Sequence, residues 1–171
     1  MADLLNGMRL SQFIEEDFTN YKKAAMFLGT TMCDGKCWRE QGLPKETCQN
    51  HALYGQCSIY APNETIAERY LRNPITHAII IGGLEPLIDR KEVLGFIETF
   101  RSIYKCNDDI VIYTGYYEEE VSDFIESIQK YPNIYMKFGR YIPNKPSRFD
   151  EVLGVTLVSD NQYGRLVTFE Q

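Results

Sequence analysis

The sequence predicts a single α/β domain over residues 1–171, an open, partial β/α barrel with a parallel sheet and an irregular C-terminal extension. Three observations support this fold class. Apolar segments of strand length alternate with segments of helical periodicity, which favours a parallel sheet with right-handed crossovers. Residues suited to chemistry follow the strands directly, as in other α/β folds. Four strand–helix units are too few to close an eight-stranded barrel, so the barrel is expected to stay open.

The first two strands and the helix between them follow from local patterns. The apolar run AAMFLG predicts a strand over residues 24–29. Asn63 is expected to cap a helix that continues to Arg72, where an Asn-Pro pair ends it. The run HAIII, rich in β-branched residues, then predicts a buried strand over residues 77–81.

The second half of the domain repeats this alternation. Asp89 and Glu92 form a capping-box pattern before a helix whose apolar residues recur at helical spacing. The run DIVIY predicts a strand over residues 109–113. A third helix is expected over residues 118–130, with acidic residues at its start, where the helix dipole favours negative charge. The run IYMKF predicts a strand over residues 134–138, and the remaining tail is expected to wrap the domain as extended segments.

The composition excludes several classes of protein. A hydrophobic content of 44% is too high for a disordered chain. The net charge of −6, without a cluster of Lys or Arg, argues against a nucleic-acid partner. No apolar run approaches the ~20 residues that span a bilayer, and the N-terminus lacks a signal-peptide pattern. The protein is therefore expected to be cytoplasmic, with neither a nucleic-acid nor a membrane partner.

The most informative motif is a group of three cysteines, Cys33, Cys37 and Cys48, in the loop after the first expected strand. In a reducing cytosol, clustered thiols hold a metal or a cluster more often than they form disulfides. Structural zinc takes four protein ligands, whereas a [4Fe-4S] cluster on three thiolates leaves one iron open to a substrate. The ten residues between Cys37 and Cys48 include Gly42 and Pro44, so this segment can loop out and return Cys48 to the other two thiols.

Zinc stays open as an alternative at this point. Cys57 could supply a fourth thiol and make the protein a zinc-binding interaction module. The intervening segments of three, ten and eight residues do not give the paired knuckles typical of zinc folds. Otherwise Cys57 and Cys106 are expected to be buried small hydrophobic residues.

A second candidate motif follows the expected strand over residues 77–81. Gly82 and Gly83 let the backbone approach a ligand closely, and Glu85 brings a carboxylate to the same edge. A carboxylate beside exposed backbone groups suits an amino-acid-like ligand whose ammonium it can pair.

Together these motifs resemble the radical S-adenosylmethionine enzymes, and among them the activating proteins of anaerobic ribonucleotide reductases. The resemblance extends over about residues 22–168, in five segments that stand in the family's order. The segments are the cysteine loop with Asn50, the run Gly82-Gly83-Leu84-Glu85-Pro86, the run Tyr113-Thr114-Gly115-Tyr116 with its following acids, Gly139-Arg140-Tyr141, and Ser159, Asn161 and Gln162 with a displaced Arg165.

The resemblance implies specific cofactors and roles. It implies a [4Fe-4S] cluster that binds S-adenosylmethionine and cleaves it reductively to a 5′-deoxyadenosyl radical. The catalytic and cluster-binding residues would be Cys33, Cys37 and Cys48, and the S-adenosylmethionine contacts would be Gly82, Gly83, Glu85, Thr114 and Asn50.

The resemblance also implies partners. The radical would be passed to a glycine of a large glycyl-radical enzyme, such as an anaerobic ribonucleotide reductase, and a flavodoxin or a ferredoxin would donate the electron. An open barrel in so short a chain suits a macromolecular partner, although a peptide or a small molecule is an alternative substrate.

The chain departs from the family's pattern at three places. The family usually has two residues between the second and third cysteines, where this chain has ten. Thr47 stands where the family has an aromatic residue next to adenine. Leu84 is inserted between Gly83 and Glu85, which alters how the carboxylate is presented. These departures indicate a small and divergent relative.

Overall fold

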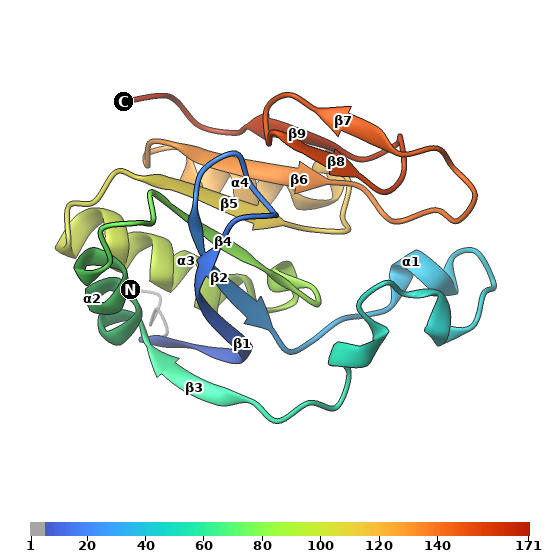
Figure 1. Ribbon diagram of the computed structural model, residues 1–171, viewed down its shortest axis with the longest axis horizontal. Helices are drawn as coiled ribbons and strands as arrows, with labels where there is room; N and C mark the ends of the chain where they lie inside the picture. Colours follow the sequence, from blue (N-terminus) through green and yellow to red (C-terminus); the bar gives the residue numbers. More distant parts are fainter. Residues whose placement is uncertain (1–5) are drawn as a thin grey trace.

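The computed structural model describes residues 6–171, whose main feature is one open sheet of seven strands (Figure 1). The four central strands run parallel to one another, and one strand pairs antiparallel with them on each side. The seventh strand pairs antiparallel with one of these two flanking strands, at the edge of the sheet. In spatial order the strands are β3 (Ile59–Pro62), β1 (Gly7–Asp17), β2 (Ala25–Thr30), β4 (Ala78–Gly83), β5 (Asp109–Tyr113), β6 (Ile134–Phe138) and β9 (Tyr163–Leu166).

The predicted parallel strands are confirmed, and with them the α/β class. β5 and β6 have the bounds that the sequence predicts, and β2 differs from its prediction by one residue at each end. β4 begins at Ala78, so the expected strand starts one residue too early, and His77 is exposed. The structure shows an open, parallel-rich sheet, and the partial barrel stays a prediction.

Two strands at one edge of the sheet are absent from the sequence-based prediction. β1 pairs antiparallel with β2, and β3 pairs antiparallel with β1, so β2 is the second strand of the chain and not the first. In β1, only Met8 and Leu10 show the alternation of buried side chains that is typical of a strand. The second half of β1 is polar and partly exposed, so the sequence pattern there does not indicate a strand. β3 is four residues long and ends in Pro62, and a proline weakens a strand pattern.

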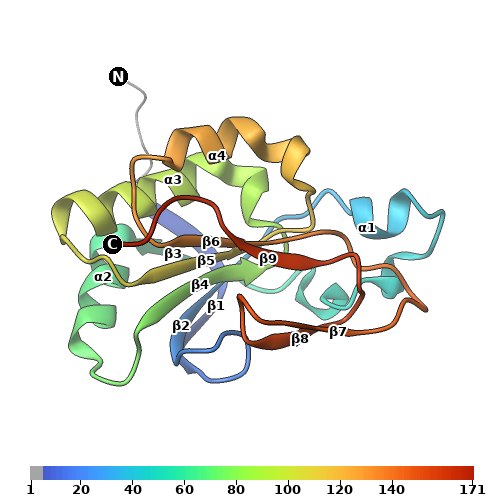
Figure 2. The same ribbon diagram turned by 90° about the horizontal axis from the view of Figure 1, so that it is seen from above.

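Three helices cover one face of the sheet (Figure 2), and their buried side chains share a single apolar cluster with that face. They are α2 (Asn63–Arg72), α3 (Arg90–Glu98), which continues as a π-helical turn (Thr99–Ile103), and α4 (Ser122–Ile128), which follows a 3₁₀ turn (Glu118–Val121). No helix within residues 6–171 is long and apolar enough to cross a membrane.

The helix starts differ in part from the sequence-based expectation. Asn63 is the first residue of α2 and does not cap it, because Pro62 occupies the capping position. Asp89 does cap α3, since its carboxylate accepts a hydrogen bond from the backbone N–H of Glu92 at 3.4 Å. The Glu92 carboxylate does not return the bond and instead binds Arg9 of β1. The capping box is therefore only half formed.

The opposite face of the sheet is covered by the C-terminal part of the chain. β7 (Arg148–Asp150) and β8 (Val155–Leu157) form an antiparallel hairpin on this face (Figure 2). Leu153 and Leu157 pack there against Ile80 and Val111. The extension is thus extended, as expected, but it is not irregular, because it forms a hairpin and the edge strand β9. Burial of both faces explains why the central strands are almost continuously apolar.

Candidate functional site

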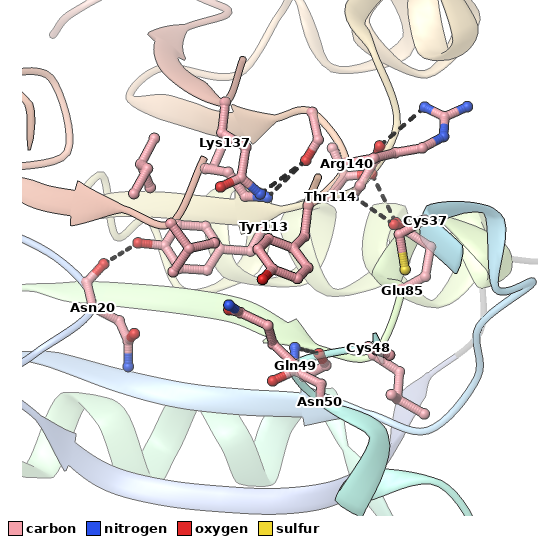
Figure 3. Close-up of a pocket in the computed structure, with 18 of the residues that line it drawn as sticks. Asn20, Cys37, Cys48, Gln49, Asn50, Glu85, Tyr113, Thr114, Lys137 and Arg140 are labelled. Atoms are coloured by element: carbon pink, nitrogen blue, oxygen red, sulfur yellow. Dashed lines mark hydrogen bonds between the residues drawn. The ribbon is translucent and has the colours of Figure 1, made fainter. Parts of the chain in front are cut away.

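A cavity of about 390 Å³ lies at the carboxyl ends of the parallel strands, on the sheet face opposite to the helices (Figure 3). Its walls come from the middle of β2, from the ends of β4, β5 and β6, from the cysteine loop, and from residues 155–158 of the C-terminal hairpin. Ligands of open α/β sheets bind at this end of the strands, and the volume is in the range of small-molecule sites, about 300–1,000 Å³.

All three cysteines of the loop line this cavity, and all are free thiols. Cys33 follows β2 closely, and Cys37 lies in the short helix α1 (Lys36–Arg39). Cys48 is buried directly after a 3₁₀ turn (Lys45–Thr47). The ten-residue insertion folds as the sequence predicts, because it loops out through Gly42, whose φ of 64° is left-handed, and brings Cys48 back to the cavity.

Two of the thiols, Cys37 and Cys48, share a hydrogen bond. A hydrogen bond with Cys37 lowers the pKa of Cys48 to about 6, and the same bond raises the pKa of Cys37. Cys37 therefore keeps the proton, while Cys48 is ready to act as a thiolate, which is the form that binds metals. Burial raises the pKa of Cys33, and its sulfur accepts a hydrogen bond from the backbone N–H of Gly35 at 3.3 Å.

This donor set suits a cluster better than a single ion. Within residues 6–171, no group of three or more His, Cys, Asp or Glu side chains is arranged to hold one metal ion. Zinc would need four ligands around one centre, and Cys57 is exposed and does not line the cavity. Three thiolates of a [4Fe-4S] cluster each bind a different iron, so they can stand further apart. The structure thus gives no support to the zinc alternative, and the expected burial of Cys57 is wrong.

The Gly-Gly segment holds the end of β4 against β2. Gly83 has a φ of 85°, and a Cβ at this position would lie 2.7 Å from the backbone nitrogen of Thr30. Only glycine fits such a close approach. Asn50, which follows Cys48 by two residues, donates a side-chain hydrogen bond to the Gly83 carbonyl at 2.9 Å. Gly83 and Asn50 both line the cavity, whereas Gly82 does not.

Glu85 is fixed in the wall of the cavity, although it is only 5% exposed. One carboxylate oxygen accepts hydrogen bonds from the Leu87 N–H at 3.0 Å and the Thr114 hydroxyl at 2.8 Å, and the other accepts one from the Gly115 N–H at 2.7 Å. Burial raises the pKa of this carboxyl, and the three donors oppose the shift. The inserted Leu84 therefore does not turn the carboxylate away from the cavity. The main contact of the Thr114 hydroxyl is with Glu85, whose carboxylate it orients.

Lys137 is a cavity residue that the sequence analysis missed. It lies in β6, and its ammonium donates a hydrogen bond to the Gly139 carbonyl at 3.1 Å. Burial lowers the pKa of Lys137 to about 8, while the charges of Glu85 and Cys37 oppose that shift. The cavity wall therefore contains both a cationic and an anionic side chain, Lys137 and Glu85 (Figure 3).

An ion-pair network fixes the helix that carries Cys37. The guanidinium of Arg140, 7% exposed, binds Glu120 at 2.6 Å and Glu40 at 2.8 Å. Lys36, the residue before Cys37, also binds Glu120, at 3.1 Å. The network therefore joins α1 to the segments that follow β5 and β6.

The ion pair between Glu120 and Arg140 should make part of the free energy of unfolding depend on pH. The hydrogen bond with Arg140 lowers the pKa of Glu120 from 4.5 to about 2. A depressed carboxyl pKa gives stability that is complete above the unfolded value and is lost as the pH falls through the folded value. In urea unfolding of the cluster-free protein, Glu120→Gln should therefore lose less stability than the wild type between about pH 5 and about pH 3.

The matched control for this experiment is Glu119→Gln at the neighbouring exposed position. It is expected to keep the slope of the wild type. Equal slopes for Glu120→Gln and the wild type would show that the pair with Arg140 does not lower the pKa of Glu120 in the folded protein.

The C-terminal segment completes the site. Gln162 lines the cavity and donates a side-chain hydrogen bond to the Gly139 carbonyl at 3.2 Å. Asn161 donates to the Arg140 carbonyl at 2.8 Å, while Ser159 is fully buried. The displaced Arg165 is exposed and pairs with Glu118, away from the cavity lining. The five sequence segments thus meet at one end of the sheet.

Comparison with known protein families gives one match. Residues 26–154 match the model of a family described as a 4Fe-4S single cluster domain. The matched span contains the three cysteines, the Gly-Gly segment and Glu85. No curated protein and no solved structure matches the chain.

Proposed function

Because the chain belongs to the family of 4Fe-4S single cluster domains, we propose that it is a radical S-adenosylmethionine enzyme whose cluster is held by Cys33, Cys37 and Cys48. The observation that carries the proposal is the meeting of three free thiols and a fixed, buried carboxylate around one cavity. The bound cluster would supply the electron for reductive cleavage of S-adenosylmethionine to methionine and a 5′-deoxyadenosyl radical.

The charged side chains of the cavity match the methionine part of this ligand. The Glu85 carboxylate is oriented by three donors and can pair with the ammonium of the ligand. Lys137, on β6, can pair with the ligand carboxylate. A zwitterionic amino acid would satisfy both groups at once. The C-terminal hairpin, which contributes Thr156 and Leu157 to the wall, limits the access of water.

The size of the cavity bears on the final substrate. A volume of about 390 Å³ leaves little space for a large substrate beside S-adenosylmethionine and a cluster. The group that gives up its hydrogen must then reach in from outside, as a backbone glycine of a protein partner can. We therefore assign the chain the role of installing a glycyl radical on a large enzyme such as an anaerobic ribonucleotide reductase. A flavodoxin or a ferredoxin would supply the electron.

The test uses anaerobically reconstituted and chemically reduced protein. With S-adenosylmethionine alone, we expect slow, uncoupled formation of 5′-deoxyadenosine, measured by chromatography. Addition of the glycyl-radical enzyme should give a stable doublet in electron paramagnetic resonance. A full cluster without 5′-deoxyadenosine would refute the radical chemistry. Modification of a peptide or a small molecule, with no doublet on any glycyl-radical enzyme, would refute only the activating role.

A further inference from the structure

The cavity has an uncharged end, on the side of Tyr113 opposite to the cysteines (Figure 3). Side chains of β1, of the turn after it, of β2 and of β5 line this end, and none of them carries a charge: Gln12, Thr19, Asn20, Phe27 and Tyr113. Glu85 lies with the cysteines, and Lys137 pairs with Tyr113 in the sheet. The cavity therefore fits a ligand with charges at one end and a neutral group at the other.

Two aromatic side chains, Phe27 and Tyr113, form the floor of the uncharged end. Gly82 on β4 makes room for both, because a Cβ there would lie 3.3 Å from the Phe27 ring and 3.5 Å from the Tyr113 Cβ. The Tyr113 hydroxyl donates a hydrogen bond to the Asn20 carbonyl, which fixes its ring (Figure 3). An aromatic floor of this kind suits a planar ring, which can stack on it.

Gln12 brings an amide to the edge of this aromatic floor. It pairs with Gly29 of β2, and a Cβ on Gly29 would lie 2.8 Å from the Gln12 Oε1, so the side chain lies against bare backbone. Within residues 6–171 this amide has no hydrogen-bond partner, whereas the Asn20 amide donates to Asp17 at 2.8 Å. A glutamine amide offers a donor and an acceptor side by side, which matches an edge of adenine.

The aromatic neighbour that adenine has in the radical S-adenosylmethionine family is missing from this chain. Thr47 stands at that position and does not line the cavity. Tyr141 does line it, but at the cluster end, because the Gln41 amide donates both to its carbonyl at 3.3 Å and to the Cys37 carbonyl at 2.6 Å. The aromatic surface away from the thiols is the floor of Phe27 and Tyr113.

The strand register connects this floor to the charged part of the cavity. Lys137, Tyr113, Gly82, Gly29 and Gln12 follow one another across β6, β5, β4, β2 and β1. Neighbouring strands lie about 4.8 Å apart, so the row extends over ~19 Å. The Lys137 ammonium is 6.0 Å from the centre of the Tyr113 ring. A ligand whose carboxylate pairs with Lys137 can therefore extend along the row toward Gln12.

We propose that Phe27, Tyr113 and Gln12 bind the adenine base of S-adenosylmethionine. The two rings stack on the base, and the Gln12 amide hydrogen-bonds its exocyclic amine and a neighbouring ring nitrogen. Gln12 is thus a specificity-determining residue. This inference rests on the ligand of the proposed function but does not require its cleavage.

The test measures binding by calorimetry, on full chains reconstituted without oxygen. The probes are S-adenosylhomocysteine, which cannot be cleaved at a sulfonium, and its analogue without the exocyclic amine of the base. The wild type should bind S-adenosylhomocysteine about tenfold more tightly than the analogue, the scale of one hydrogen bond. Gln12→Leu should lose this preference by weakening only the first ligand. Phe27→Leu should weaken both ligands about tenfold and keep the preference.

The matched controls are Gln129→Leu and Phe149→Leu. Gln129 is exposed after α4, Phe149 is 60% exposed in β7, and neither lines the cavity. Both control variants should bind the two ligands as the wild type does. All four variants should keep the iron content of the wild type, because none of the changed residues is a thiol of the cluster.

The preference for the exocyclic amine decides the inference. A folded Gln12→Leu protein that keeps the preference, or that weakens both ligands equally, overturns it. If Phe27→Leu does not fold, the preference in Gln12→Leu decides alone. A wild type that cleaves S-adenosylmethionine without preferring the amine also overturns the inference but leaves the proposed function intact. A wild type that shows the preference and leaves S-adenosylmethionine uncleaved refutes the proposed function alone, and one that binds neither ligand refutes both.

Discussion

Replacement of Cys33, Cys37 or Cys48 by alanine should abolish the cluster. We expect wild-type protein purified without oxygen to be brown and to contain about four iron atoms per chain, as a cubane cluster requires. Each of the three thiols lines the cavity, and the sulfurs come from two sides of a long loop. Loss of one sulfur leaves two ligands, and the described residues place no fourth cysteine in the cavity lining to replace it. Iron analysis and the visible absorption spectrum measure the result.

The matched controls are the other two cysteines. Cys57 is exposed, and Cys106 packs partly buried against the apolar cluster under the helices. Cys57→Ala and Cys106→Ala should therefore keep the iron content of the wild type. Stoichiometric zinc without iron after anaerobic reconstitution would refute the cluster assignment. A complete loss of metal in Cys57→Ala would refute it as well.

Substitution of Glu85 should have the second-largest effect, on binding of S-adenosylmethionine. If the carboxylate holds the ligand ammonium, Glu85→Ala should weaken binding by about 2–3 kcal/mol, the scale of a charge-assisted hydrogen bond. That loss corresponds to roughly 30- to 150-fold in the dissociation constant. Calorimetry on the reconstituted protein measures it, and the iron content should not change.

Two further variants separate the charge of Glu85 from its structural role. Glu85 also accepts bonds from Thr114 and Gly115, so Glu85→Ala leaves donors in the wall unpaired. Glu85→Gln removes the charge with less disturbance and should lose most of the affinity. Thr114→Val removes one orienting donor, keeps the charge and should lose clearly less. Unchanged affinity in Glu85→Gln would show that the carboxylate does not contact the ligand ammonium.

The parallel strands could be predicted because buried strands are short, almost continuous runs of apolar residues in the sequence. Strands such as β5 and β6 are buried on both faces, so short apolar runs with turn residues at their ends fix their bounds. The antiparallel edge could not be predicted in this way. The second half of β1 is polar, so its sequence lacks the alternation of apolar residues that marks a strand. Its partner β3 has only four residues, of which one is buried, and it is recognised as a strand by its pairing with β1.

The same contrast applies to the site. Cys33, Cys37 and Glu85 stand close to strand ends, where the sequence order already places chemistry. Lys137 could not be assigned, because a single lysine in an apolar strand faces the cavity only if the helices cover the other face.

The C-terminal wall of the cavity has a consequence for biosynthesis. Residues 155–158 and Gln162, which close the cavity, follow Cys48 by more than 100 positions. A ribosome adds about 5–20 residues each second, so the cysteines emerge roughly 5–20 seconds before the wall that covers them. During that interval the hairpin does not yet cover the three thiols. Delivery of iron and sulfide to the cysteines is therefore least hindered before the hairpin folds over them.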